Sequence, residues 1–276
     1  MLGEFLCLKK IILSIATIAA TASLAVSVQA SEKVELKVAT DSDTAPFTYQ
    51  KDGKFKGYDV DVVKAVFKGS KYKVTFKTVP FDTISTGIDA GKFDLSANDF
   101  SYNKERAEKY LFSDPISRSN YAVVGKKGSH YKSLSDLSGK STEVLSGVNY
   151  AQVLENWNKN HPNKKPIKIK YVSGTTGVTS RLKNIESGKI DFILYDAISS
   201  DYIVKDQSLN LSVSPLKGKI GNNKDGLEYL LLPKDKKGKT LQKFINKRIK
   251  VLKENGTLAR LSKQYFGGDY VSNIDK

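Results

Sequence analysis

The twelve residues IDAGKFDLSAND, at positions 88–99, return in outline as IESGKIDFILYD at positions 185–196. Aligned without a gap, the two stretches share isoleucine, glycine, lysine and two aspartates. Each stretch has the pattern of a helix end, a glycine cap, a short apolar strand and an acid after the strand. The repeat predicts two similar α/β units, each with an aspartate, Asp99 or Asp196, at the carboxyl edge of a strand.

Short apolar strands alternate with amphipathic helices on both sides of this repeat. Strands are expected at 34–40, 72–79, 93–98, 141–147, 167–172, 190–196 and 227–232. Helices are expected at 58–67, 83–91, 104–110, 149–157, 177–187 and 239–254. This βαβ order indicates parallel sheets with helices on their faces, an α/β fold class. Ligands of such open sheets bind at the carboxyl ends of the strands, where the two repeated aspartates are expected.

The first thirty residues differ from the rest of the chain. Lys9 and Lys10 precede the apolar run at 11–28, and VQA at 28–30 has the small residues of a cleavage site. This pattern predicts a secretory signal peptide over residues 1–30, so the protein is expected outside the cell or at its surface. The alternative is an uncleaved membrane anchor, since the run is about long enough to cross a bilayer.

Cysteine and charge limit the chemistry of the exported part. The single cysteine, Cys7, precedes the apolar run, so no lipidation motif is found and the mature chain has no thiol. The net charge is +16, and cleavage after Ala30 would leave +15. Nucleic acid is not an expected partner of an exported protein. The lysines, spread along the chain, either contact membrane or anionic cell-wall polymer or form a solvated surface, and both readings stay open.

The sequence contains no recognisable motif for catalysis or for metal binding. His130 and His161 lie in polar, turn-forming stretches without a ligand partner at helical spacing. The triplets GKS at 139–141 and GKT at 238–240 lack the earlier glycine that a phosphate-binding loop needs. We therefore expect no catalytic residue, no metal and no cofactor.

Four stretches together resemble a known family. They are ATDSDTAPFTY (39–49), FKGYDVDVVKAVF (55–67), GKFDLSANDFSYNKERAEKYLFSDP (91–115) and LKENGTLARLSKQYFG (252–267). The chain is similar to the extracellular solute-binding proteins, family 3, of bacterial ABC importers for polar amino acids, and is cystine-binding-like. The resemblance implies a two-lobed, periplasmic-binding-protein-like type II fold with two hinge crossings. It puts lobe 1 at 31–118 and 227–276, lobe 2 at 119–226, and the hinges near 117–121 and 224–228.

The resemblance also assigns the two charges of an amino-acid head group. Arg106, near a helix start where a cation opposes the helix dipole, would bind the α-carboxylate. Asp196 would bind the α-ammonium. The alternatives are a surface pair of Arg106 with Glu105 or Asp114, worth about 0–1 kcal/mol, and a helix-capping role for Asp196.

Further ligand contacts follow from the same resemblance. Asn98 and Ser101 would contact the head group, and N–H groups of Ser146, Val148 and Asn149 at a helix start would meet the carboxylate. Phe81 and Tyr195 would lie at the side-chain pocket, and one or more of Asp41, Thr44 and Phe47 would face the ligand from the first loop. The alternatives are turn and helix-capping roles for Asn98 and Ser101, a plain strand–helix turn at 145–149, and a core position for Phe81.

Asp99 departs from the small residue that this family often has at its position. A further acid would disfavour aspartate or glutamate and suit a ligand with a second ammonium, such as cystine or a basic amino acid. The expected function is a monomeric, non-enzymatic receptor that binds a free polar amino acid, with cystine the leading candidate. The receptor would deliver it to a membrane permease. The alternatives are an exported dehydratase on the same fold and a basic surface adhesin.

Overall fold

The computed structural model describes residues 33–217, 220, 224, 226–272 and 274. The expected signal peptide at 1–30 and Cys7 lie outside the described residues. Across the described ranges, none of the helices combines the length and the apolar character that a membrane span requires.

One sheet contains the strands in the order β5-β1-β6-β14-β7, with β8 paired to β14. Its parallel strands are β1 (Val34–Thr40), β5 (Tyr72–Thr78) and β6 (Leu95–Ser101), and its antiparallel strand β14 spans Leu227–Pro233. The short strands β7 (Tyr110–Phe112) and β8 (Ser117–Arg118) pair with β14. We call this sheet and its helices lobe 1.

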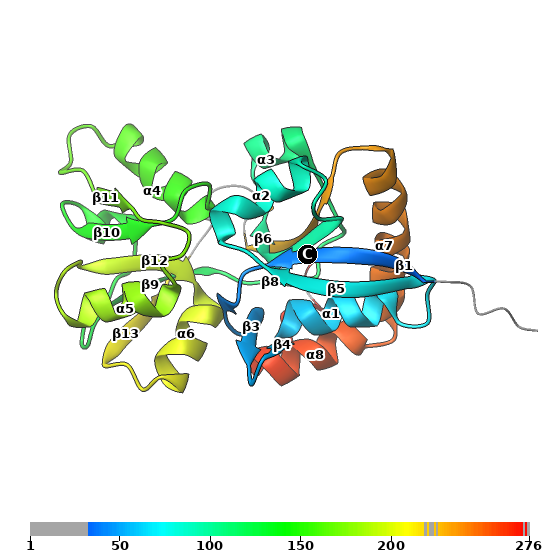
Figure 1. Ribbon diagram of the computed structural model, residues 1–276. Helices are drawn as coiled ribbons and strands as arrows, with labels where there is room; N and C mark the ends of the chain where they lie inside the picture. Colours follow the sequence, from blue (N-terminus) through cyan, green and yellow to red (C-terminus); the bar gives the residue numbers. More distant parts are fainter. Residues whose placement is uncertain (1–32, 218–219, 221–223, 225, 273, 275–276) are drawn as a thin grey trace, which may run out of the picture. The chain divides into compact units, whose positions relative to one another are not determined.

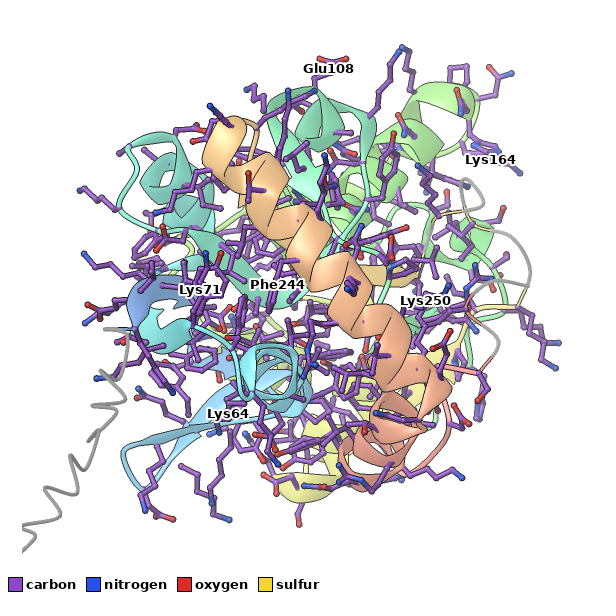
Figure 2. All side chains as sticks on the ribbon, turned by 90° about the vertical axis from the view of Figure 1, so that its right-hand side faces the viewer. Lys64, Lys71, Glu108, Lys164, Phe244 and Lys250 are labelled. Atoms are coloured by element: carbon purple, nitrogen blue, oxygen red, sulfur yellow. The ribbon has the colours of Figure 1, made fainter. Side chains whose placement is uncertain are left out.

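Lobe 1 buries apolar side chains on both faces of its sheet. Helices α1 (Tyr58–Phe67), α7 (Lys236–Glu254) and α8 (Thr257–Phe266) pack together on one face, and α2 (Phe81–Asp89) lies on the other (Figure 1). Along β14, Leu230 and Leu232 join the core under α1 and α7, whereas Leu231 joins the core under α2. Phe244 of α7 stacks on Phe67 of α1 at 5.6 Å between ring centroids (Figure 2). Apolar runs such as that of β14 therefore indicate a strand covered on both faces.

The second sheet has the order β11-β10-β12-β9-β13. Its strands are β9 (Tyr121–Lys126), β10 (Ser141–Val144), β11 (Lys168–Tyr171), β12 (Phe192–Asp196) and β13 (Leu211–Pro215). Helix α4 (Asn149–Asn160) lies on one face, and α5 (Val178–Glu186) and α6 (Ala197–Asp206) lie on the other (Figure 1). We call this sheet and its helices lobe 2.

The chain passes between the two sheets twice. It leaves lobe 1 after β8 and enters lobe 2 at β9, and it returns between β13 and β14. The two connections touch, because the Ser119 N–H donates to the Gly226 carbonyl at 2.8 Å. A small β-ribbon of β2 (Asp43–Thr44), β3 (Thr48–Lys51) and β4 (Lys54–Lys56) links β1 to α1, and the short helix α3 spans Lys104–Lys109.

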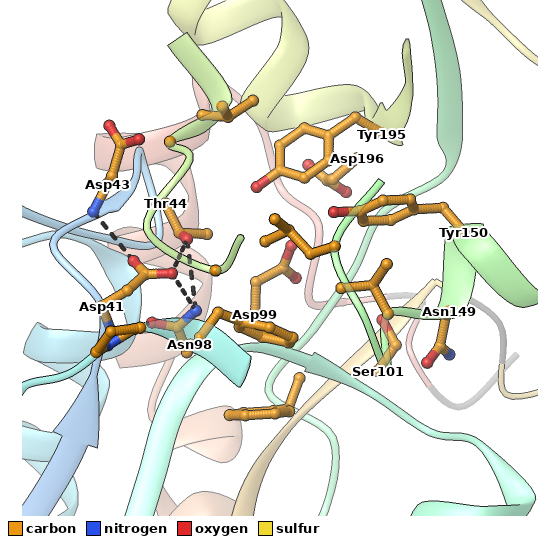
Figure 3. Close-up of a pocket in the computed structure, with 18 of the residues that line it drawn as sticks. Asp41, Asp43, Thr44, Asn98, Asp99, Ser101, Asn149, Tyr150, Tyr195 and Asp196 are labelled. Atoms are coloured by element: carbon orange, nitrogen blue, oxygen red, sulfur yellow. Dashed lines mark hydrogen bonds between the residues drawn. The ribbon is translucent and has the colours of Figure 1, made fainter. Parts of the chain in front are cut away.

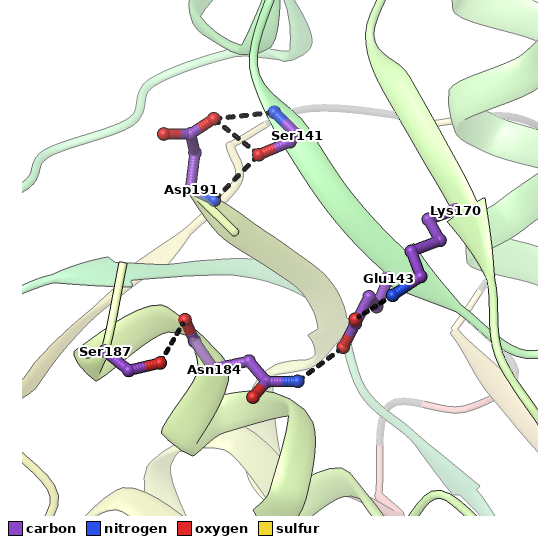
Figure 4. Close-up of polar contacts among 6 residues, drawn as sticks. All are labelled: Ser141, Glu143, Lys170, Asn184, Ser187 and Asp191. Atoms are coloured by element: carbon purple, nitrogen blue, oxygen red, sulfur yellow. Dashed lines mark hydrogen bonds and ion pairs between the residues drawn. The ribbon is translucent and has the colours of Figure 1, made fainter. Parts of the chain in front are cut away.

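The sequence repeat corresponds to one structural joint built twice. Asp94 accepts a hydrogen bond from the Lys37 N–H at 2.7 Å, and Asp191, its equivalent, accepts one from the Ser141 N–H at 2.7 Å (Figure 4). The glycines after α2 and α5 are both left-handed, with φ of 66° at position 91 and 76° at position 188. Each aspartate thereby fixes the start of its strand to the neighbouring strand.

The bounds of β1 and α1 agree with the sequence predictions, and the differences elsewhere have local causes. Helix α7 begins three residues earlier than expected, because the Asp235 carboxylate caps it by accepting from the Gly238 N–H at 2.6 Å. Strand β6 continues to Ser101, beyond the expected end at 98, because it pairs with β14 at Phe100 and Ser101.

Gly57 lets the first loop pass close to the start of α1. Its φ is 123°, and a Cβ there would lie 2.2 Å from the Phe47 carbonyl oxygen. We expect Gly57→Ala to lower the free energy of unfolding by about 3 kcal/mol, because both backbone conformation and space exclude a side chain. Urea denaturation measures this loss. Gly53→Ala is the control, since Gly53 is left-handed at φ 69° with nothing within 4 Å. Equal losses in the two variants would contradict the role of the close contact.

Candidate ligand-binding site

A cavity of about 500 Å³ is lined by residues of both lobes (Figure 3). Lobe 1 contributes the loop after β1, the start of α2 and the end of β6. Lobe 2 contributes the start of α4, the loop before α5 and the end of β12. These are carboxyl ends of strands, and the volume is that of a small-molecule site.

Most of the residues singled out from the sequence line this cavity. They are Asp41, Thr44, Phe81, Asn98, Asp99, Ser101, Arg106, Val148, Asn149, Tyr195 and Asp196. The structure places Phe47 and Ser146 elsewhere. Phe47 is fully buried, with its ring centroid 4.8 Å from that of Phe266, because the first loop turns this side chain into the core of lobe 1. Ser146 is exposed in the loop after β10.

Asn98 joins the end of β6 to the loop after β1. Its Oδ1 accepts from the Thr40 hydroxyl at 2.9 Å and from the Asp41 N–H at 2.6 Å. Its Nδ2 donates to Asp41 Oδ2 at 2.8 Å, and the Thr44 hydroxyl donates to the same oxygen at 2.7 Å (Figure 3). Asn98 is buried, so these bonds hold two segments of the cavity wall in register.

Asp99 occupies a backbone conformation that favours glycine. Its φ is 49°, and its N–H donates to Asp59 Oδ2 at 2.9 Å. Figure 3 shows its carboxyl group in the cavity, between Asn98 of lobe 1 and Tyr195 and Asp196 of lobe 2. Burial, and then the neighbouring acid Asp196, raise the pKa of Asp99 well above its ordinary value. An acid in this position is stabilised by a proton or by a cation.

Asp196 caps α6 and lines the cavity at the same time. Its Oδ1 accepts from the Ser199 N–H at 2.8 Å, so the capping role considered from the sequence is present. Burial raises the pKa of Asp196 to about 6, although hydrogen bonds from Ser119 and from the start of α6 oppose the shift. The carboxyl group would gain from a neighbouring cation.

Arg106 reaches from lobe 1 to lobe 2. Its backbone N–H is accepted by the Asn103 cap at 2.6 Å, and its Nη1 donates to the Ser101 carbonyl at 2.5 Å. Its Nη2 donates to the Gly147 carbonyl of lobe 2 at 2.8 Å. Burial lowers the pKa of Arg106 to about 10, so the guanidinium stays charged at neutral pH. Within the described ranges Arg106 makes no ion pair, so the alternative pairing with Glu105 or Asp114 is not seen.

Other polar contacts join the lobes around the cavity. Asn149 Nδ2 donates to the Tyr102 carbonyl at 2.6 Å, and Asn103 Nδ2 donates to Asn149 Oδ1 at 3.0 Å. On the other side, the Gly174 N–H donates to Asp82 Oδ2 at 3.1 Å. The two walls of the cavity are therefore in direct contact, as in a closed binding cleft.

Among the polar residues of the cavity wall that sequence reasoning missed are Asp43, Tyr150 and Arg181. A signal for Arg181 exists in the pattern of α5. Val178, Leu182 and Ile185 form its buried stripe, and Arg181 lies within that stripe. A charged residue at an apolar position of a helix predicts a functional site or a buried partner.

The cavity combines both signs of charge. Four aspartates line it, at positions 41, 43, 99 and 196, together with Arg106 and Arg181. In the part of the chain that the structure describes, no group of three His, Cys, Asp or Glu side chains could hold a metal ion. Such a site suits a small ligand that carries carboxylate and ammonium groups.

The chain is similar in sequence to known binding proteins. The sequence pattern of the bacterial extracellular solute-binding proteins, family 3, matches residues 36–268. The Bacillus subtilis L-cystine-binding protein TcyA is 31% identical over 242 residues, which cover 86% of this chain and 83% of TcyA. The probable amino-acid-binding protein YxeM of Bacillus subtilis is 31% identical over 237 residues, which cover 85% of this chain and 84% of YxeM.

A solved structure extends the likeness to the fold. That structure concerns glutathione import in Gram-positive bacteria via GshT and the cystine ABC importer TcyBC of Streptococcus mutans. That structure is 39% identical to this chain, with a TM-score of 0.81 and coverage of 88% of this chain and 99% of the other. The fold is the two-lobed type II arrangement of periplasmic binding proteins, as the resemblance implied. The chain belongs to the bacterial extracellular solute-binding proteins, family 3.

Proposed function

We propose that this protein is an extracellular, non-enzymatic receptor that binds a polar amino acid between its lobes and delivers it to an ABC importer. The observation that carries the proposal is the pairing of opposite charges across one cavity. Arg106 enters from lobe 1, and Asp196 ends a strand of lobe 2. A free amino acid carries the two complementary charges one carbon apart.

The proposed binding mode uses these charges directly. The guanidinium of Arg106 binds the α-carboxylate, helped by the N–H groups at the start of α4, near Val148 and Asn149. The α-ammonium binds Asp196, with Asp99 beside it, and replaces the proton that burial favours on these acids. Because each lobe supplies part of the site, the ligand stabilises the closed arrangement. We place the lobe boundaries at 118/119 and 226/227, where the chain crosses between the sheets.

Cystine remains the leading ligand, and glutathione is a second candidate. TcyA is named an L-cystine-binding protein, and the structure at 39% identity concerns glutathione import and a cystine importer. Both compounds carry an amino-acid head group. Four aspartates at the cavity disfavour aspartate and glutamate.

The surface charge supports a further part of the proposal. Positive charge is spread over the surface, since exposed lysines project from α1, from α7 and from two loops (Figure 2): Lys64, Lys250, Lys71 and Lys164. We propose that the exported monomer associates loosely with anionic cell-wall polymer through this charge. Such binding would be screened by salt.

A thermal-shift screen of the twenty amino acids, cystine and glutathione tests the ligand class. At a ligand concentration of 100 times Kd, binding contributes about 2.7 kcal/mol, which raises Tm by roughly 5–10 °C for a protein of this size. We expect this rise with cystine or glutathione and none with aspartate or glutamate. A response to glutamate alone would contradict the proposed specificity.

Replacing Arg106 tests the head-group contact. We expect Arg106→Gln to weaken ligand binding about 100-fold in isothermal titration calorimetry, because a charge-assisted, paired contact is lost. Lys104→Gln is the matched control, since Lys104 is exposed on the same helix and the same charge is removed. Equal affinities of the two variants would show that Arg106 does not touch the ligand.

The raised pKa of Asp196 predicts a pH dependence of binding. The ammonium pairs with the ionised carboxyl group, so affinity should be level above about pH 7 and fall about tenfold per pH unit below pH 6. Binding at pH 6 should release protons, which calorimetry detects as heats that vary with the buffer. Asp196→Asn should bind weakly at every pH. An affinity of the parent protein that is unchanged between pH 5 and 7 would refute the contact.

The raised pKa of Asp196 has the opposite effect on the stability of the ligand-free protein, which falls as pH rises. The pKa of Asp196 is raised from 3.8 to about 6 in the folded state, so its favourable contribution is full below pH 3.8 and is lost as pH rises through 6. Asp41, Asp59, Asp99 and Glu228 have raised pKa values as well. The free protein should therefore have a higher Tm at pH 5 than at pH 7.5, while its stabilisation by ligand is smaller at pH 5.

A further inference from the structure

Arg181 is the most deeply buried charge at the cavity. It lies on α5, and only 2% of its surface is exposed. Its neighbours on the same helix face, Val178, Leu182 and Ile185, belong to the apolar core of lobe 2. Arg181 nevertheless lines the cavity, so its charged end meets the ligand space. A guanidinium in such surroundings requires an anion or a full set of acceptors.

The protein itself supplies only part of that set. Arg181 Nη1 donates to the Tyr150 hydroxyl at 3.4 Å, and its Cζ lies 5.7 Å from the centroid of the Tyr195 ring. Its Nε is buried without a hydrogen-bond partner among the described residues. None of the four ion pairs in the described ranges includes Arg181.

Lobe 2 treats another buried charge differently. Glu143 is 4% exposed, and it pairs with Lys170 Nζ at 3.2 Å and with Asn184 Nδ2 at 2.8 Å (Figure 4). Glu143 thus has both a counter-ion and a hydrogen-bond donor within lobe 2. Arg181 has the Tyr150 hydroxyl but no ion pair among the described residues, and it lines the cavity, where an anion of the ligand can reach it.

Asp43 is the acid of the cavity wall that interacts electrostatically with Arg181, but its carboxylate does not form an ion pair with the guanidinium. Burial and the neighbouring charge of Asp41 raise the pKa of Asp43. A hydrogen bond from the Val178 N–H and the charge of Arg181 lower this pKa, but by less. The two residues are not within ion-pair distance. Asp43 therefore leaves the strong donor sites of Arg181 to a closer anion.

We infer that Arg181 binds a second carboxylate of the ligand, remote from the head group that Arg106 and Asp196 hold. The inference rests on the proposed function, which places the α-carboxylate at Arg106. The cavity then selects compounds whose second carboxylate lies farther from the head group than the side-chain carboxylate of aspartate or glutamate, which would stay beside the acids Asp99 and Asp196. The distal amino acid of cystine and the glycine end of glutathione both supply this group. Arg181 is thereby a specificity-determining residue of the site.

Ligand pairs that differ only at the distal carboxylate test this role. One pair is glutathione and its glycine ethyl ester, and the other is L-cystine and the mixed disulfide of L-cysteine with cysteamine. By calorimetry with the parent protein, we expect loss of the distal carboxylate to weaken binding about 10- to 100-fold. The pair that shows this discrimination identifies which compound is the source of the second carboxylate.

The variant Arg181→Gln completes the cycle. It should bind both members of a pair within about threefold of each other, because no charge remains to read the carboxylate. Arg181→Lys should discriminate less than the parent, since the paired geometry is lost. A purely structural role would instead lower both affinities and leave their ratio unchanged, which would overturn the inference.

The parent protein alone is decisive if the variants do not fold. Equal binding of both members of each pair to the parent protein refutes the second-carboxylate site and leaves the proposed receptor function in place. It would also indicate that Asp43 occupies Arg181 in solution. If no amino acid or amino-acid derivative binds to the parent protein, the proposed function and this inference both fail.

Discussion

The hydrogen bonds of the Asn98 amide hold the binding region together. One buried side chain bonds to Thr40 and to Asp41, and so ties the end of β6 to the loop after β1. That connection fixes where Asp41 and Thr44 stand, and it fixes the chain just before Asp99 takes its left-handed turn. An amide is suited to this position because it donates and accepts at once. The floor of the cavity on the lobe-1 side depends on these few bonds.

Several charged side chains that line the cavity have incomplete sets of partners within the protein. Three acids outside the cavity have clear partners: Asp94 and Asp191 each accept from the backbone of a neighbouring strand, and Glu143 binds Lys170. Around the cavity, Asp99 and Asp196 have raised pKa values, and Arg181 forms no ion pair with any acid that the structure describes. Buried charges that lack partners in a closed cavity favour the binding of a ligand with the complementary arrangement of charges.

The periodicity of apolar residues predicted most of this fold, because buried helices and strands repeat their apolar residues at characteristic spacings. The bounds of β1 and α1 followed from apolar patterns alone, and the repeated joint indicated two units. Spacing does not tell which way a loop side chain turns. Phe47 is one of three first-loop residues of which one or more is expected to face the ligand, and it packs on Phe266 instead. Arg181 was missed for a related reason. The apolar pattern of α5 shows which face of the helix is buried, but it does not show that part of this face borders the cavity.

The contacts between the lobes have a consequence for affinity. Asp82 does not line the cavity, yet its carboxylate accepts from the Gly174 N–H of lobe 2. Asn149, which does line the cavity, likewise joins lobe 2 to Tyr102 and Asn103. Such bonds favour the closed state whatever the cavity contains. The measured dissociation constant equals the intrinsic constant divided by the closed fraction. A substitution of Asp82, which lies outside the cavity, would therefore scale the affinity for every ligand by one common factor, so that strength of capture can change while selectivity stays the same.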